Sequence, residues 1–343
     1  MIESIQFTNF KALRQTTLPL SPFTLLLGPN GSGKTSILQA LQGIAAIFPL
    51  PGKSQTGLAQ PSSLSVTTKD RNAAVEIKLC LRLNQQRIDA AFQWHPKGPA
   101  TNRFNYADGR ALNGGEVQLP KQWLGRMQIY FLDALAIAQP SAVNSGPLQW
   151  NGAGLAAVLD DLKDNHPDRW EMLLEEMRRW LPEYDYIMFD KPQPGSKALV
   201  LRTKKGGHRI PATALSQGTL IGLALLTLAY LPDPPSLVGL EEIDRGLHPR
   251  LLRHLQDALY RLSYPESCGE TRAPIQVIVT THSPYLLDLY RDHHKEIVLA
   301  QKEGLEVQMK RLADIEHYEE ILGDSPLSEV WYSGVLGGVT VKP

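Results

Sequence analysis

The chain has 343 residues, with 35 basic and 35 acidic side chains and no net formal charge. This balance excludes a protein that is basic overall and coats nucleic acid, although a local basic groove remains compatible with it. Hydrophobic residues make up 43% of the chain, which is typical of a globular protein with a large core. The length predicts one large domain or two modest ones.

The two cysteines, Cys80 and Cys268, have no neighbouring cysteine or paired histidine at zinc-ligand spacing. A zinc site and a disulfide framework are therefore not expected, and a reducing cytoplasm suits the chain. The first residues show no secretory signal pattern. The longest apolar run, residues 220–231, is shorter than the roughly 20 residues that span a bilayer. We expect a buried helix there, no membrane segment and a cytoplasmic location.

The first part of the chain predicts strands around a glycine-rich loop. Apolar residues alternate near the start and recur at Phe23–Leu27, which indicates short strands. Residues 28–36 form the loop, and an amphipathic helix should follow and end before Pro49. The segment 52–65 is rich in Ser, Gly, Gln and Pro and should be a loop.

The middle of the chain predicts a β-hairpin and then helices. Residues 75–83 and 88–94 alternate and indicate the hairpin, and 96–115 is polar and should be a loop. Residues 155–181 indicate two helices, which Asn165, His166 and Pro167 interrupt. A strand at 198–202, a turn at 204–207 and a second short strand should follow.

The last third predicts a parallel α/β sheet. An apolar helix after Ser216 is followed by strands at Leu237–Leu240 and Gln276–Thr281. Strand, helix and strand in this order are typical of parallel sheets. A further strand is expected at 296–300.

The glycine-rich loop matches the phosphate-binding pattern GxxxxGK[ST] in full. Its residues are Gly28, Pro29, Asn30, Gly31, Ser32, Gly33, Lys34 and Thr35, with Ser36 next. Such a loop directs backbone N–H groups at one anion, and the helix N-terminus adds a favourable dipole. Lys34 should reach the β- and γ-phosphates, and the Thr35 hydroxyl should bind Mg²⁺. The alternative, a glycine turn that happens to end in Lys-Thr, is disfavoured by the strand before it and the helix after it.

Two acids follow the strand at Leu237–Leu240, where ligands bind in open α/β sheets. We predict that Glu241 holds the Mg²⁺ shell and that Glu242 polarises the attacking water. The first acid is usually aspartate, so the longer Glu241 should act through a water or a shifted strand. The alternative is a solvated pair of acids that opens a loop.

Two further motifs complete the set. Ser216 and Gly218, in the run LSQGT before the apolar helix, indicate a second anion site, and an ordinary helix cap is the alternative. His282 ends the strand at Gln276–Thr281 and could hydrogen-bond the γ-phosphate. A structural histidine is the alternative there. Loop, Ser-Gly segment, acids and histidine follow one another in the order of ABC ATPases.

The runs LEEIDRGLHPRLL and VIVTTHSPYLLD resemble the RecF/SMC/OLD-like ATPases of the ABC superfamily, often labelled AAA-family ATPases. The runs NFKALR and GPNGSGKTS resemble the start of the same group, and EVWYSGVLGG resembles the tail of its stand-alone members. The resemblance implies a P-loop NTPase of ABC type, α/β in class. It would have a mostly parallel core sheet, an antiparallel β subdomain and a helical subdomain. We expect one head over 1–343, with parts at 1–135, 136–235 and 236–343.

The resemblance also implies a mechanism with ATP and Mg²⁺. Two heads face each other head to tail, and Ser216 and Gly218 of one cover the ATP on Lys34 and Thr35 of the other. Residues 244–248 would lie across the seam as the D-loop. Asn9, Phe10 and Lys11 would flank the base.

These expectations favour an ATP-hydrolysing homodimer that acts as a switch on DNA or on a separate effector protein, in genome maintenance or antiviral (phage) defence. The chain shows no heptad run for a coiled coil and no DxD pair after His282 for a nuclease domain. The alternatives are a transporter nucleotide-binding subunit and a binding module with little hydrolysis. The basic turn formed by Lys204, Lys205, His208 and Arg209 could touch phosphates, or could be a solvated turn.

Overall fold

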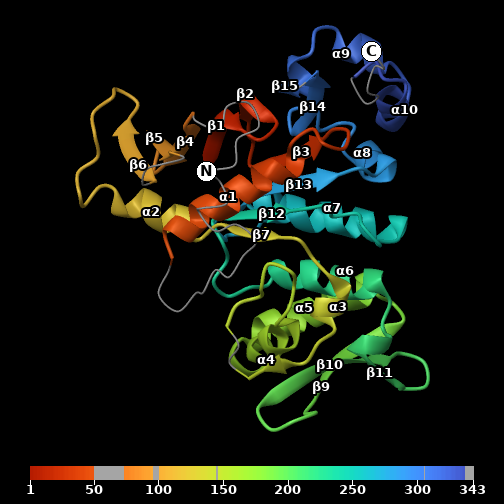
Figure 1. The fold of residues 1–343 in the computed structure, drawn as a ribbon. Coiled ribbons are helices and arrows are strands. Elements are labelled where there is room, and N and C mark those ends of the chain that lie inside the picture. Colours follow the sequence, from red (N-terminus) through yellow and green to blue (C-terminus); the bar gives the residue numbers. More distant parts are fainter. Residues whose placement is uncertain (50–72, 96–99, 144–145, 305, 337–343) are drawn as a thin grey trace.

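The computed structural model describes residues 1–49, 73–95, 100–143, 146–304 and 306–336 (Figure 1). The loop predicted at 52–65 lies outside the described residues, as do the last two residues of EVWYSGVLGG. Strands gather into three sheets, and helices cover both faces of the central one.

A five-stranded antiparallel sheet has the order β2-β1-β4-β5-β6. Its strands are β1 (Ile2–Phe10), β2 (Leu13–Pro19), β4 (Val75–Leu83), β5 (Gln86–Trp94) and β6 (Thr101–Tyr106). The predicted hairpin is β4 and β5, paired from Val75–Trp94 to Leu83–Gln86. The loop prediction for 96–115 is wrong where β6 forms. This edge strand buries only Phe104 and leaves Thr101, Asn102 and Arg103 exposed, so its sequence shows no clear apolar alternation.

A six-stranded central sheet has the order β15-β14-β3-β13-β12-β7. Its strands are β3 (Phe23–Leu27), β7 (Gln128–Tyr130), β12 (Leu237–Leu240), β13 (Gln276–Thr281), β14 (Ile297–Glu303) and β15 (Glu306–Arg311). All pairs are parallel except β14 with β15, so the predicted mostly parallel sheet is confirmed. Strands β3, β12 and β13 lie side by side, and the loops that follow them therefore meet at one edge.

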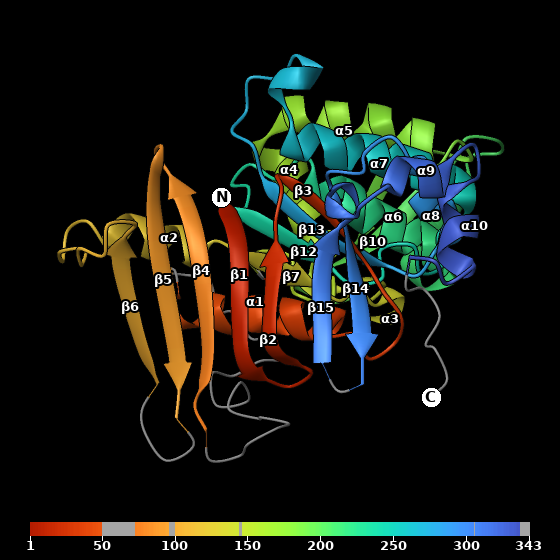
Figure 2. The same ribbon diagram turned by 90° about the horizontal axis from the view of Figure 1, so that it is seen from above.

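Helix α1 (Lys34–Ile47) lies between the antiparallel sheet and the central sheet (Figures 1 and 2). Its buried residues Ile37, Leu41 and Ile44 join one core with the inner face of the antiparallel sheet. Figure 2 shows β2 beside β15, where the Thr16 hydroxyl donates a hydrogen bond to the Val307 carbonyl at 2.7 Å. This packing fixes the phosphate loop at the start of α1 against the sheet edge.

The other face of the central sheet carries α7 (Pro249–Ser263) and α8 (Pro284–Leu289). Near it the chain continues into α9 (Tyr318–Leu322) and α10 (Leu327–Tyr332). Helix α2 (Gln118–Gly125) packs against α1 (Figure 1).

A helical lobe lies below the central sheet in Figure 1. Its helices are α3 (Ala134–Ile137), α4 (Leu155–Asn165), α5 (Pro167–Trp180) and α6 (Gln217–Leu228), with strands β8 (Ser141–Ala142), β9 (Tyr184–Asp190), β10 (Ser196–Thr203) and β11 (Arg209–Pro211). The predicted break between two helices is confirmed, because Pro167 occupies the first turn of α5. Helix α6 is the expected buried apolar helix. Within the part of the chain that the structure covers, no helix has the length and apolarity needed to cross a membrane.

Candidate functional site

The glycine-rich loop leads from β3 into α1 and folds around the Lys34 ammonium group. Lys34 Nζ donates hydrogen bonds to the carbonyl oxygens of Gly28 at 2.7 Å and Pro29 at 3.1 Å. Gly33 adopts a left-handed φ of 86°, which glycine reaches without strain. A Cβ atom at Gly28 would lie 2.6 Å from Ser32 Oγ and 2.8 Å from the Ala300 carbonyl oxygen. The loop is therefore tight enough to require glycine at position 28.

The first acid of the pair reaches the loop directly. Thr35 Oγ1 donates a hydrogen bond to Glu241 Oε1, and Thr280 Oγ1 donates one to Glu241 Oε2 at 3.1 Å. The Glu241 carboxylate is thus held between the start of α1 and the end of β13. The Glu241 side chain is thus long enough to reach the Thr35 hydroxyl directly.

The second acid has a strained backbone. Glu242 has a φ of 44°, in the left-handed region that non-glycine residues rarely adopt. Its backbone N donates to Thr280 Oγ1 at 2.9 Å, and the next residue, Ile243, donates to the Thr280 carbonyl at 3.2 Å. Such outliers gather at functional sites, where the surrounding structure holds them in place. His282 Nε2 lies 4.0 Å from Glu242 Oε1.

Burial sets the charges of these groups. It lowers the pKa of Lys34 to about 8, although the charges of Glu241 and Glu242 oppose this shift. Burial likewise raises the pKa of Glu241, against the hydrogen bonds from Thr35 and Thr280. Burial, followed by the Lys34 charge, lowers the pKa of His282, so its imidazole is neutral at pH 7. A partly buried cation, two acids and a neutral imidazole therefore share one small region.

A second line of contacts joins the histidine segment to residues 244–248. Thr281 Oγ1 donates a hydrogen bond to Asp244 Oδ1 and accepts one from the Ser283 backbone N at 2.9 Å. The position of the segment that follows Glu242 is thereby tied to the loop that carries His282.

Ser216 and Gly218 lie apart from the phosphate loop, on another part of the protein surface. They line a cavity of about 290 Å³ to which no residue of 28–36 contributes. Ser216 caps α6, because its Oγ accepts a hydrogen bond from the Thr219 backbone N at 3.1 Å. A Cβ atom at Gly218 would lie 2.5 Å from the Gly246 carbonyl oxygen, so the start of α6 packs directly on segment 244–248.

The structure thus brings together most of the residues that the sequence singled out. The loop, Glu241, Glu242 and His282 meet at one edge of the sheet, while Ser216 and Gly218 form a separate surface. The sequence analysis assigned no role to Thr280 and Thr281, which directly precede His282. In the structure Thr280 forms hydrogen bonds with Glu241 and Glu242, and Thr281 forms one with Asp244. Their only signal was two hydroxyls in direct succession at the end of β13.

The expected base contact is wrong for one of its three residues. Phe10 is fully buried in the core with α1 and cannot stack on a base. Asn9, near the end of β1, and Lys11, in the turn to β2, adopt left-handed φ values of 56° and 52°.

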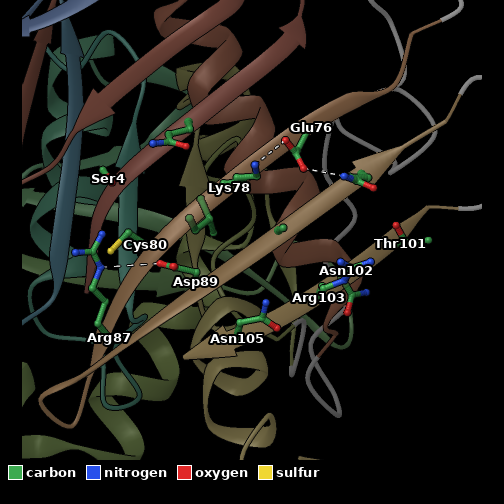
Figure 3. A pocket seen from close by; sticks show the side chains of 14 residues that line it. Ser4, Glu76, Lys78, Cys80, Arg87, Asp89, Thr101, Asn102, Arg103 and Asn105 are labelled. Atoms are coloured by element: carbon green, nitrogen blue, oxygen red, sulfur yellow. Dashed lines mark hydrogen bonds and ion pairs between the residues drawn. The ribbon is translucent and has the colours of Figure 1, made fainter. Parts of the chain in front are cut away.

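A cavity of about 510 Å³ lies on the outer face of the antiparallel sheet (Figure 3). Four of its charged residues form two ion pairs with each other. Lys78 Nζ lies 3.0 Å from Glu76 Oε2, and Arg87 Nε lies 4.0 Å from Asp89 Oδ1. The cavity includes none of the residues of the loop or of the acid pair. It is therefore distinct from the candidate site.

The parallel sheet, the loop at its edge and the acids on the next strand define a P-loop ATPase of the ABC type. Comparison with known families agrees. Residues 116–288, just over half of the chain, match the family described as "AAA domain, putative AbiEii toxin, Type IV TA system". Residues 1–122 match the AAA ATPase domain family. The chain belongs to this group of AAA domains and is an ATPase.

Individual relatives place the chain in the predicted RecF/SMC/OLD-like branch. It is 49% identical over 337 residues to the OLD nuclease of Thermus scotoductus, and the match covers 85% of this chain and 60% of that protein. The chain thus spans about 60% of the length of this relative.

Solved SMC heads share the fold. An SMC head bound to the C-terminal winged-helix domain of ScpA has a TM-score of 0.63 at 17% identity, covering 91% of this chain and 98% of that one. The SMC head domain derived from Pyrococcus yayanosii has a TM-score of 0.55 at 12% identity, covering 94% and 99%. The predicted fold class is confirmed.

Proposed function

We propose that this chain binds Mg·ATP at residues 28–36, hydrolyses it with Glu242 and His282, and closes on a second copy of itself while ATP is bound. The observation that carries this proposal is the hydrogen-bonded line from Thr35 through Glu241 and Thr280 to the Glu242 backbone. It joins the loop that would hold the phosphates to the acid that would activate water.

The loop suits a triphosphate. In the free protein the Lys34 ammonium group is held by two backbone carbonyls, and burial weakens its charged state. Phosphate oxygens would replace those carbonyls and stabilise the charge. The Ser32 hydroxyl is fully buried and has no hydrogen-bond partner among the described residues. The loop thus retains unused hydrogen-bonding capacity.

Thr35 and Glu241 are the residues that would hold Mg²⁺, since their oxygens already adjoin each other. Oxygen ligands of this kind suit a hard cation. When bound, Mg²⁺ would neutralise charge on the β- and γ-phosphates.

Glu242 and His282 would act on the water and the terminal phosphate. The Glu242 carboxylate would accept a proton from the attacking water, as a general base in reach of it. The neutral His282 imidazole can donate one hydrogen bond to a phosphate oxygen. The Thr280 hydroxyl accepts a hydrogen bond from the Glu242 backbone N and holds this part of the backbone in place before ATP arrives.

Closure on a second copy gives the separate Ser216 surface a role. Ser216 and Gly218 of one copy would cover the ATP held by the other, so ATP binding would contribute free energy to association. The closed dimer would act as a switch on DNA or an effector protein, in genome maintenance or phage defence. The nuclease among its relatives supports nucleic acid as a partner.

Glu242→Gln tests the switch. This variant should bind ATP, hydrolyse it slowly and accumulate as a dimer in light scattering with Mg·ATP, but not with Mg·ADP. Wild type should be mostly monomeric once ATP is consumed. A variant that stays monomeric with Mg·ATP at concentrations that saturate the site would overturn the dimer.

A further inference from the structure

The cavity beside the start of α6 is lined by two basic residues to which the proposed ATPase cycle assigns no role. Its volume is about 290 Å³, and Ser216, Gly218, Glu183, His248 and Arg250 are among the residues that line it. The last two come from the start of α7, and Ser216 comes from the start of α6. The cavity therefore brings two basic residues together with Ser216.

His248 offers a hydrogen-bond donor there. Its Nδ1 accepts a hydrogen bond from the Arg250 backbone N at 3.2 Å. Because an accepting ring nitrogen carries no proton, the proton of the neutral ring lies on Nε2. Nε2 has no hydrogen-bond partner within the described parts of the chain. An acceptor that enters the cavity can therefore bind it.

Arg250 adds a charge without a counter-ion. Its side chain is exposed, and no acid among the described residues forms an ion pair with it. The acid that lines the cavity is Glu183, whose carbonyl accepts a hydrogen bond from the Lys204 backbone N at 2.8 Å. A guanidinium group without a counter-ion and a free N–H donor in the same cavity favour an anionic ligand.

The backbone holds the two sides of the cavity in a fixed relation. The close approach of Gly218 to the Gly246 carbonyl leaves no room for a side chain between α6 and the segment that leads to His248. His248 itself caps α7, which orients its ring. Ser216 and His248 are therefore held in a fixed relation, with Arg250 beside them.

We propose that His248 and Arg250 bind the terminal phosphate of the ATP carried by a second copy of this chain, together with Ser216 and Gly218. This inference rests on the proposed dimer and adds two residues to it. A guanidinium group and an N–H donor would stabilise the charge on that phosphate, which ADP lacks. The same contacts would make closure depend on the third phosphate.

A mixing experiment tests whether Arg250 acts on the ATP bound by the second copy or on the ATP bound by its own head. Lys34→Ala removes the phosphate-binding lysine, and Arg250→Ala removes the proposed contact, so each variant alone should turn over ATP about 100-fold more slowly. An equal mixture should recover about a quarter of wild-type turnover. Half of its dimers are mixed, and each mixed dimer has one complete site of two. If Arg250 acts within its own head, mixing recovers nothing.

Association provides a second readout that does not depend on turnover. In the Glu242→Gln background, Arg250→Ala or His248→Ala should raise the dissociation constant of the ATP-bound dimer at least about tenfold. Arg253→Ala, which removes another exposed arginine of α7 outside the cavity, is the matched control and should have no effect. Unchanged dimerisation in both variants would overturn the inference. If Glu242→Gln alone never dimerises with ATP, the proposed function itself fails.

Discussion

The hydroxyl of Thr35, in the first turn of α1, donates a hydrogen bond to Oε1 of Glu241, which directly follows β12. These residues lie 206 positions apart, and their contact joins the phosphate loop to the acid pair. Both oxygens are suitable ligands for one divalent cation.

Thr35→Val should remove the gain in ATP affinity that Mg²⁺ provides. Valine has nearly the shape of threonine but offers no oxygen ligand, so we expect roughly tenfold weaker binding of Mg·ATP. Binding of ATP in EDTA should change little. Titration of a fluorescent ATP analogue with and without Mg²⁺ measures both. Thr35→Ser, which keeps the hydroxyl, should behave like wild type, and a valine variant with unchanged Mg²⁺ dependence would remove Thr35 from the cation site.

ATP affinity should fall as pH rises above about 8, since burial lowers the pKa of Lys34 to about 8 and the triphosphate binds its charged form. The expected loss approaches about tenfold per pH unit, and binding at pH 8.5 should take up protons from the buffer. Calorimetry in buffers of different ionisation enthalpy detects this uptake. Lys34→Arg stays charged in this range, so its weaker binding should not change with pH. If the wild type binds ATP at pH 8.5 without taking up protons, the lowered pKa of Lys34 is contradicted.

The same shift affects folding. Between pH 8 and about 10.5 the unfolded chain keeps the Lys34 proton and the folded chain releases it. The contribution of Lys34 to the free energy of unfolding should therefore rise with pH across this window.

Glu242→Gly should stabilise the nucleotide-free protein relative to Glu242→Ala. Both changes remove the carboxylate, but only glycine adopts the φ of 44° without strain. The expected difference is about 1 kcal/mol in the free energy of unfolding, measured by urea denaturation. Both variants should lack ATP turnover. Equal stability of the two would show that Glu242 stores no backbone strain.

Gly218→Ala should destabilise the chain by about 1–3 kcal/mol, because the new Cβ atom would lie 2.5 Å from the Gly246 carbonyl oxygen. Gly222→Ala is the control in the same helix. Its Cβ atom would meet only Leu251 Cδ1, at 3.8 Å, so helix propensity should stabilise it by up to about 1 kcal/mol. Thermal unfolding distinguishes the two. Similar effects of both changes would contradict the tight packing of α6 on segment 244–248.

The sequence predicted the elements that bury regular apolar patterns. Strands β12 and β13 were predicted with their observed bounds, because they are short, fully buried apolar runs. Strands β6, β7, β8, β9 and β15 were not predicted. Of these, β6 is a polar edge strand that buries only Phe104, and β7 has three residues, too few to show a period.

The site was predictable where its chemistry depends on local motifs. The phosphate loop, the acid pair and His282 were found because each sits at the end of a strand, and the parallel sheet brings such ends together. The strain at Glu242 and the bridging role of Thr280 could not be read from the sequence, since both depend on contacts between separate strands. The same holds for the cavity that joins Ser216 to Arg250.

The most direct test is the rate of Mg·ATP turnover by wild type and by Glu242→Gln, with ATP binding measured alongside. The substitution keeps the shape of the side chain but removes its ability to accept a proton. We expect turnover to fall about 100-fold or more while ATP affinity stays within a few-fold of wild type. Equal turnover by the two proteins would contradict the account, because Glu242 would then take no part in activating the water.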